Sequence, residues 1–147
     1  MDWKAVLKDD LMRDEGLRLK AYLDTVGVAT IGFGATRRLD GSRVQLGDVI
    51  TREQAEELLQ RDMGFAIEDA RKVVPCFDQL DPVRKTVMAN MAYNLGATRL
   101  AEFKNTIHSV CIGDYKDAAL RMLQSRWAAQ VKGRAKRLSN RMLTGKL

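Results

Sequence analysis

The segment from Asp14 to Gly34 reads DEGLRLKAYLDTVGVATIGFG and decides the fold class of this 147-residue chain. From Leu17 to Tyr22, apolar residues alternate with polar ones, which is the period-2 pattern of a half-buried strand. The second half combines β-branched residues with closely spaced glycines, and Asp40-Gly41 is a turn signal farther along. These patterns predict a small sheet of two or three short strands within residues 17–46.

Helical patterns lie on both sides of the predicted sheet. Asp2 is a candidate cap for a first helix that ends near Glu15-Gly16. Thr51 and Gln54 have the spacing of a capping box, and the amphipathic helix that follows ends before Pro75 because proline disfavours helical geometry in the residue before it.

Shorter helices are predicted in the rest of the chain. Asp81-Pro82 reads as a cap followed by a first-turn proline, and Gly96 as the stop of that helix. Two or three more helices are expected, over roughly residues 105–112, 114–124 and 132–143. We therefore predict an α+β fold in which a small antiparallel sheet lobe is joined by a long helix to a mainly helical C-terminal lobe. Residues 1–147 form one domain in this prediction, with a β-containing lobe at about 15–50 and helical parts at 1–14 and 51–147.

The basic residues are concentrated near the C-terminus. The net charge is +6, and residues 115–147 carry nine Lys and Arg but a single acidic residue, Asp117. Such a segment attracts polyanions, and nucleic acid, an anionic membrane and an anionic cell wall all fit. Charges are scattered through the first ten residues, so we expect no signal peptide and synthesis in a cytoplasm.

The two cysteines, Cys76 and Cys111, are too few for a disulfide framework. A cytosolic start favours reduced thiols, so we expect two small buried hydrophobic residues. A single bridge formed after release from the cell is the alternative.

Several classes of catalytic site are excluded by residue content. His108 is the only histidine, there is no Gly-x-Ser-x-Gly motif, and one histidine with two distant cysteines does not make a zinc site. Paired carboxylates remain, and glycoside cleavage requires two. Glu15 ends the first predicted helix and Asp24 follows nine residues later. The spacing alone is weak evidence, because the chain has 19 acidic residues.

The sequence around these two carboxylates closely resembles the active-site segment of the phage-type lysozymes, glycoside hydrolase family 24. That family has Glu, eight residues, Asp, five residues, Thr, and then Ile-Gly-aromatic-Gly, and Glu15, Asp24 and Thr30 match it in type and spacing. The resemblance continues almost to the end of the chain, through Ile50–Glu56, Asn90–Gly96, Ser125–Gln130, Gly133–Arg137, Arg141 and Thr144-Gly145.

The resemblance implies a role for each matching residue. Glu15 would be the general acid, and Asp24 and Thr30 would hold a water on the opposite face of the sugar, which gives inversion and a carboxyl separation of roughly 6.5–9.5 Å. Gly34, Asn94 and Arg134 would contribute to substrate binding, with Arg134 orienting the acid. The chain departs from the family at Ala35, where many members have a histidine.

The function implied is an N-acetylmuramidase that cleaves the β-1,4 bond between N-acetylmuramic acid and N-acetylglucosamine in peptidoglycan. The resemblance also implies a monomeric phage endolysin without cofactor or metal, which stays in the host cytoplasm until a holin-type protein releases it to the cell wall. We expect no nucleic-acid partner. We do expect electrostatic contact with an anionic cell wall or membrane. The alternative is a basic protein that binds peptidoglycan, membrane or nucleic acid without catalysis.

Overall fold

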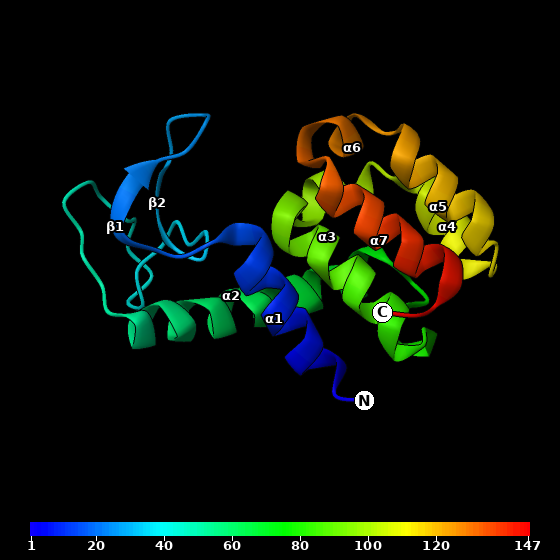
Figure 1. Ribbon diagram of the computed structural model, residues 1–147, viewed down its shortest axis with the longest axis horizontal. Coiled ribbons are helices and arrows are strands. Elements are labelled where there is room, and N and C mark those ends of the chain that lie inside the picture. Colours follow the sequence, from blue (N-terminus) through cyan, green and yellow to red (C-terminus); the bar gives the residue numbers. More distant parts are fainter. The chain divides into compact units, whose positions relative to one another are not determined.

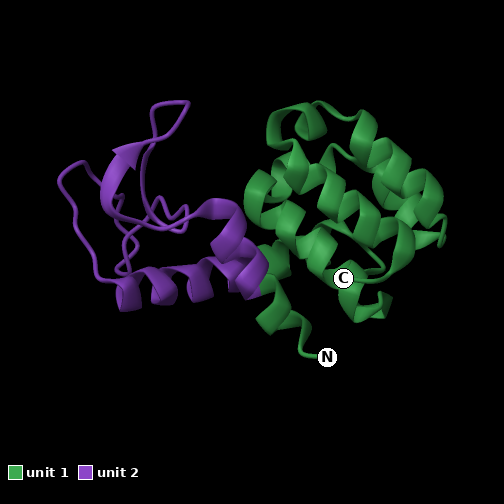
Figure 2. Cartoon of the chain, in the orientation of Figure 1, with its two compact units in different colours: residues 1–7, 66–147 green, residues 8–65 purple.

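The computed structural model describes residues 1–147, which divide into two compact units (Figure 2). We call residues 8–65 the hairpin unit, and residues 1–7 with 66–147 the helical unit. Helices α1 (Trp3–Glu15) and α2 (Arg52–Val73) each contribute residues to both units. Both strands lie in the hairpin unit and five further α-helices lie in the helical unit (Figure 1), so the predicted α+β class is confirmed.

The sheet of the hairpin unit has two antiparallel strands, β1 (Arg18–Leu23) and β2 (Ala29–Gly32). Tyr22 lies opposite Thr30, and a bulge interrupts the register between Arg18 and Tyr22. Single bridges join Lys20 to Val49, Ile31 to Ala35 and Arg37 to Arg43, and extend the pairing into the loops. The prediction of a small sheet within residues 17–46 is therefore confirmed, with two regular strands.

Ala35 belongs to the core of the hairpin unit. It is buried with Ile31, Val44 and Leu58, which form one apolar cluster. A methyl group therefore fills the position at which the resemblance implies a histidine, and the polar contacts of the following loop come from other residues.

The loop after Ala35 is held by an ion pair between Arg38 and Asp48. The Nε and Nη2 atoms of Arg38 donate to the two carboxylate oxygens at 2.8 Å each. The backbone N–H of Gln45 donates to the same carboxylate at 3.1 Å. The hydrogen bonds from Arg38, and then the one from Gln45, lower the pKa of Asp48 to about 2.

This ion pair predicts how the stability of the hairpin unit depends on pH. The folded pKa of Asp48 is lower than the unfolded value of about 3.9. The contribution is therefore complete above the unfolded pKa and disappears as the pH falls through the folded pKa. We expect Asp48→Asn to unfold at less urea than the wild type at neutral pH, and the difference in midpoint to shrink between about pH 5 and pH 2. An equal difference at both ends of this range would show that ionisation of Asp48 is not its cause.

The predicted helix starts are confirmed by cap hydrogen bonds. The backbone N–H groups of Lys4 and Ala5 donate to Asp2 Oδ1. Thr51 and Gln54 form the reciprocal pair of a capping box, with distances of 2.9 and 3.1 Å. Helix α3 (Pro82–Ala101) starts at the Asp81 cap, and Arg84 N donates to the carboxylate of that residue.

Helices α3 to α7 fill the helical unit. Gly96 has φ 77° and ψ 165°, so it interrupts α3 with a kink at the predicted stop, and a second helical stretch follows directly. The next helices are α4 (Lys104–Cys111), α5 (Tyr115–Gln124) and α7 (Gly133–Thr144), close to the predicted ranges. The short helix α6 (Arg126–Val131), capped by Ser125, was not predicted. No helix combines the length and the apolar character that crossing a membrane would require.

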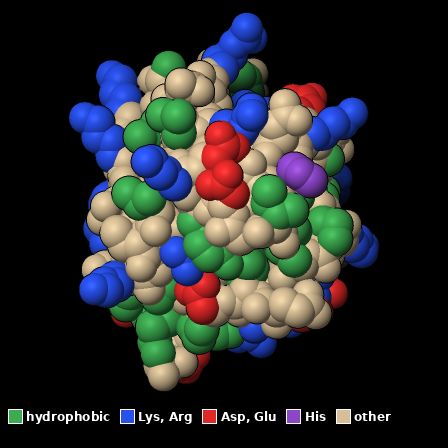
Figure 3. Space-filling view, turned by 90° about the vertical axis from the view of Figure 1, so that its right-hand side faces the viewer, with side chains coloured by type: hydrophobic (Ala, Val, Ile, Leu, Met, Phe, Trp, Pro, Cys, Tyr) green, Lys and Arg blue, Asp and Glu red, His purple; other side chains and the backbone are tan.

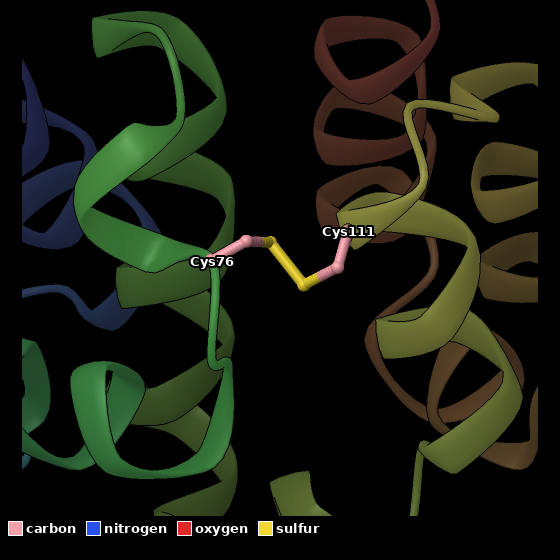
Figure 4. The surroundings of a disulfide bond; sticks show 2 residues. All are labelled: Cys76 and Cys111. Atoms are coloured by element: carbon pink, nitrogen blue, oxygen red, sulfur yellow. A yellow bond between two sulfur atoms is a disulfide. The ribbon is translucent and has the colours of Figure 1, made fainter.

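The expectation of two reduced, buried thiols is wrong. Cys76 and Cys111 form a disulfide within the helical unit (Figure 4), with their Cα atoms 5.4 Å apart. Cys76 precedes the 3-10 turn η1 (Phe77–Gln79) and is half-buried, and Cys111 ends α4 and is exposed. The bond therefore ties the connection between α2 and α3 to a helix that lies 35 residues later in the chain.

Candidate active site

Glu15 is the last residue of α1, and its half-buried carboxylate lies against Gly34. A β-carbon placed on Gly34 would lie 3.1 Å from Glu15 Oε2 and 3.6 Å from its carboxyl carbon. Gly34 follows β2 in a tight loop closed by two backbone hydrogen bonds of 2.8 Å between Ile31 and Ala35. The structure thus brings together two of the predicted site residues, and Gly34 leaves the space that the carboxylate occupies.

Gly34→Ala is expected to reduce hydrolysis about 10-fold or more, because the new methyl group pushes the Glu15 carboxylate out of its position. Gly41→Ala is the matched control. Both glycines have φ +88°, so alanine suffers the same backbone strain of roughly 1–2 kcal/mol at each, but nothing lies within 4 Å of a β-carbon on Gly41. Urea midpoints and initial rates on purified peptidoglycan should show similar stability losses and an activity loss for Gly34→Ala alone. Equal activity losses would contradict the role of Gly34.

Asp24 is fixed by the turn that joins β1 to β2. Its Oδ1 atom accepts backbone hydrogen bonds from Val26 and Val28, both at 2.9 Å. The backbone N–H of Asp24 donates to the Val28 carbonyl at 3.0 Å. The carboxylate is therefore held in one orientation by its own turn, and the hydrogen bonds from Val26 and Val28 go to the same oxygen, Oδ1.

Thr30 is linked to Asp24 through the peptide group of Val28. The Thr30 hydroxyl donates to the Val28 carbonyl at 2.9 Å, the same oxygen that accepts from Asp24 N. Thr30 lies on β2 and is only 4% exposed. Since its hydroxyl proton is used in this bond, the Oγ1 lone pairs are the part of the group that can accept a further hydrogen bond.

Asn94 and Arg134 belong to the helical unit. Asn94 Oδ1 accepts from Trp127 Nε1 at 2.7 Å, so the NH2 group of Asn94 is the part that remains to donate to a ligand. Arg134 is buried, and its Nε donates to Asn90 Oδ1 at 2.9 Å. Trp127 is 3% exposed and packs in the core of the helical unit.

The helical unit also contains an open cavity of about 600 Å³. Phe103 and Trp127, whose rings meet edge to face with centroids 6.2 Å apart, contribute apolar surface to it. Its charged lining is mainly cationic, with one acidic residue, Glu102, against Arg99, Lys104, Arg121 and Arg126. Such a lining suits a ligand that combines apolar and anionic groups.

Sequence reasoning missed the contacts made by backbone groups and amides. The Val28 carbonyl carries no side-chain signal, although a β-turn before Thr30 could have suggested it. Asn90 lies within a predicted helix, and its bond to Arg134 has no local signal because 44 residues separate them. His108 is exposed on α4, which agrees with its exclusion from catalysis.

Comparison with known proteins identifies similar chains. The family described as phage lysozyme matches residues 12–143. The probable T4-type lysozyme 2 of Dictyostelium discoideum is 30% identical, and the alignment covers 96% of this chain and 95% of that protein. The endolysin of Salmonella phage P22 is 34% identical over 74% of this chain and 73% of its own length.

A third similar protein is much longer. The pre-baseplate central spike protein of Enterobacteria phage T4 is 34% identical over 93% of this chain. The matched region is only 27% of the spike protein, so this chain corresponds to about a quarter of it.

Proposed function

We propose an acid-assisted mechanism for this chain, which belongs to the phage lysozyme family and is thus a glycoside hydrolase of peptidoglycan. In this proposal the chain is an N-acetylmuramidase that cleaves the β-1,4 bond between N-acetylmuramic acid and N-acetylglucosamine. The observation that carries it is the Glu15 carboxylate held against Gly34, with Asp24 and Thr30 both hydrogen-bonded to the backbone of Val28 in the same unit.

Glu15 acts as the general acid. Its proton passes to the glycosidic oxygen as the bond from the sugar carbon to that oxygen breaks, so the leaving sugar departs as a neutral alcohol. The absence of a side chain on Gly34 supports this role, because it leaves room for the carboxylate beside a backbone that a sugar ring can approach closely. We assign Arg134, buried and held by Asn90, the role of orienting Glu15.

Asp24 and Thr30 position the attacking water. The Asp24 carboxylate accepts one proton of the water, and the Thr30 hydroxyl oxygen accepts a hydrogen bond from the other. The hydrogen bonds of both residues to the backbone of Val28 support this assignment, because they fix the position of Asp24 relative to Thr30 within one tight turn. Water then attacks the sugar carbon opposite the leaving group, and a single displacement inverts its configuration.

Substrate binding uses groups of the helical unit in this proposal. The NH2 group of Asn94 donates to a sugar oxygen, and the cationic cavity at Arg99, Lys104 and Arg126 binds carboxylates of the peptides that substitute the glycan. We further propose that the chain works as a monomeric endolysin in host lysis and reaches the wall with the help of a holin-type protein. The similarity to the P22 endolysin supports this biological role.

Product analysis tests the mechanism. Wild-type protein on purified peptidoglycan should release new reducing ends on N-acetylmuramic acid, with the α-anomer formed first, as NMR of the early products would show. A β-anomer would mean retention, and an anhydro product would mean that no water attacks; either result overturns the proposed mechanism while leaving the family assignment intact. Glycan stripped of its peptides should show a raised KM.

Asp24→Asn separates the catalytic role of this residue from its structural one. Asparagine keeps an oxygen that can accept the bonds from Val26 and Val28, so we expect a normal turn and urea midpoint. Without a carboxylate to take the proton of water, hydrolysis should fall about 100-fold or more. Asp24→Ala should lose both activity and stability. Full activity of Asp24→Asn would show that the residue only shapes the turn.

A further inference from the structure

Helices α5 and α7 pack side by side and run in opposite directions (Figure 1). Near the middle of α5, the Ser139 hydroxyl of α7 donates to the Ala119 carbonyl at 3.0 Å. At the N-terminal end of α5, Arg84 of α3 contacts both helices. Its guanidinium carbon lies 3.5 Å from the ring centroid of Tyr115, and its Nε donates to the Met142 carbonyl of α7 at 2.8 Å. The last turn of α7 therefore lies beside the first turn of α5.

Each of the two helices carries an exposed stripe at positions i, i+4 and i+7, which share one face of a helix. The stripe next to buried Ala119 consists of Lys116, Leu120 and Leu123, and the stripe next to buried Ser139 consists of Lys136, Asn140 and Leu143. Because the helices are antiparallel and touch at Ala119 and Ser139, both stripes open to the same side of the pair. We call these six residues the α5/α7 face.

The α5/α7 face combines apolar and cationic side chains. Leu120, Leu123 and Leu143 are 52%, 46% and 48% exposed. None of the six residues is acidic, and α7 has no acidic residue at all. Asp117 of α5 lies on another side of its helix, where its carboxylate accepts hydrogen bonds from Ser109 of α4 and from Arg121.

The charge of the surrounding surface has the same sign. Residues 115–147 carry nine Lys and Arg against one acidic residue. Figure 3 shows the side of the molecule that faces right in Figure 1, and Lys and Arg side chains outnumber Asp and Glu on it. Anions are therefore attracted to the helical unit over a range of roughly one Debye length, about 8–10 Å at physiological salt.

We propose that the α5/α7 face docks on the surface of an anionic phospholipid bilayer. The leucines enter the boundary between headgroups and acyl chains, and Lys116 and Lys136 remain at the level of the lipid phosphates. A soluble polyanion would bind the lysines but would gain nothing from three exposed leucines, so the combination favours a lipid surface. The face includes none of the residues assigned to catalysis, and its docking goes beyond the function proposed above.

Vesicle binding tests this proposal without involving hydrolysis. Wild-type protein should sediment with large vesicles made of equal parts phosphatidylglycerol and phosphatidylcholine, and should stay in solution with vesicles of phosphatidylcholine alone. Salt at about 1 M, where the Debye length is about 3 Å, should weaken the binding strongly. Failure to bind the anionic vesicles at low salt overturns the proposal.

Variants then test the face itself. Leu120→Ser combined with Leu123→Ser should lower the partition coefficient by at least roughly 10-fold, because each leucine loses its transfer out of water. The matched control is Leu39→Ser combined with Leu46→Ser, which replaces two leucines of the hairpin unit that are 49% and 59% exposed. Lys116→Glu combined with Lys136→Glu should lower the partition coefficient at low salt.

Two results would contradict docking through this face. One is equal loss of binding in the two leucine variants. The other is unchanged binding of the Leu120→Ser, Leu123→Ser protein together with full competition by a soluble polyanion such as polyglutamate, which would show charge recognition alone. All variants should hydrolyse purified peptidoglycan like the wild type, so a failure of the docking proposal and a failure of the proposed catalytic mechanism give different results.

Discussion

Replacing Glu15 with glutamine is expected to reduce the release of reducing ends from purified peptidoglycan by at least ~100-fold, the loss typical of a missing general acid. Glutamine keeps the size and shape of the side chain, so it fits the same space against Gly34. It has no acidic proton to give, and the leaving oxygen must then depart with its negative charge. The effect should appear in kcat, because the interaction that is lost arises only as the bond breaks.

Glu57→Gln is a suitable control for this experiment. Glu57 is an exposed glutamate on α2 in the same unit, so its variant changes the net charge by the same amount. Full activity of Glu57→Gln and an unchanged urea midpoint for Glu15→Gln would attribute the loss to the acid itself.

The comparison of wild type with Glu15→Gln also tests the alternative that the chain is a basic binding protein without catalytic activity. A basic protein that acts by binding walls or membranes would barely respond to one carboxylate in the hairpin unit. If wild type and Glu15→Gln disrupt cells equally and neither releases reducing ends, Glu15 is not a catalyst here. The docking of the α5/α7 face would then become the leading candidate for the function of the chain.

Features encoded by neighbouring residues could be predicted from the sequence. The caps at Asp2, Thr51 and Asp81 each depend on residues two or three positions apart, and all three are present. The sheet followed from alternation and turn residues within residues 17–46. Such signals are local, so no knowledge of the tertiary structure was required.

Helix α6 shows where a local signal is too short to interpret. Its six residues give fewer than two turns, which is too little for a helical period to be recognised. The next residue, Lys132, has φ 52°, a conformation that few residues other than glycine adopt. A non-glycine residue in that conformation has no sequence signature, so a helix could be predicted from about residue 132 onward, but the separate helix α6 before it could not.

The candidate site could be predicted in its residue types but not in its supporting contacts. Glu15, Asp24 and Thr30 came from a motif. The proximity of Gly34 to Glu15 depends on how α1 meets the loop after β2, and the bond between Arg134 and Asn90 depends on the packing of α7 against α3. Contacts of this kind depend on tertiary structure and produce no periodic pattern in the sequence.

The pairing of Cys76 with Cys111 could be named only as an alternative, because no local feature of the sequence brings the two residues together. Cys76 and Cys111 are 35 residues apart, yet the fold brings their Cα atoms to 5.4 Å, within the usual range for a disulfide. The charged residues near the N-terminus bear only on where the chain is made, and a bridge can form later in an oxidising environment.

Removing this disulfide is expected to lower the free energy of unfolding by about 4 kcal/mol, the loop-closure entropy of a loop of this length. That is a large share of the roughly 5–15 kcal/mol by which a domain is stable, and it should lower Tm by about 10 °C or more. The double variant Cys76→Ser with Cys111→Ser, unfolded in urea under oxidising conditions, measures the loss. Reductant should lower the wild-type midpoint to that of the variant and leave the variant unchanged, which separates the bond from any effect of serine. A variant as stable as the oxidised wild type would mean that the packing of η1 and α4 holds these segments together without the bond, and reduced and oxidised protein would then be equally resistant to unfolding.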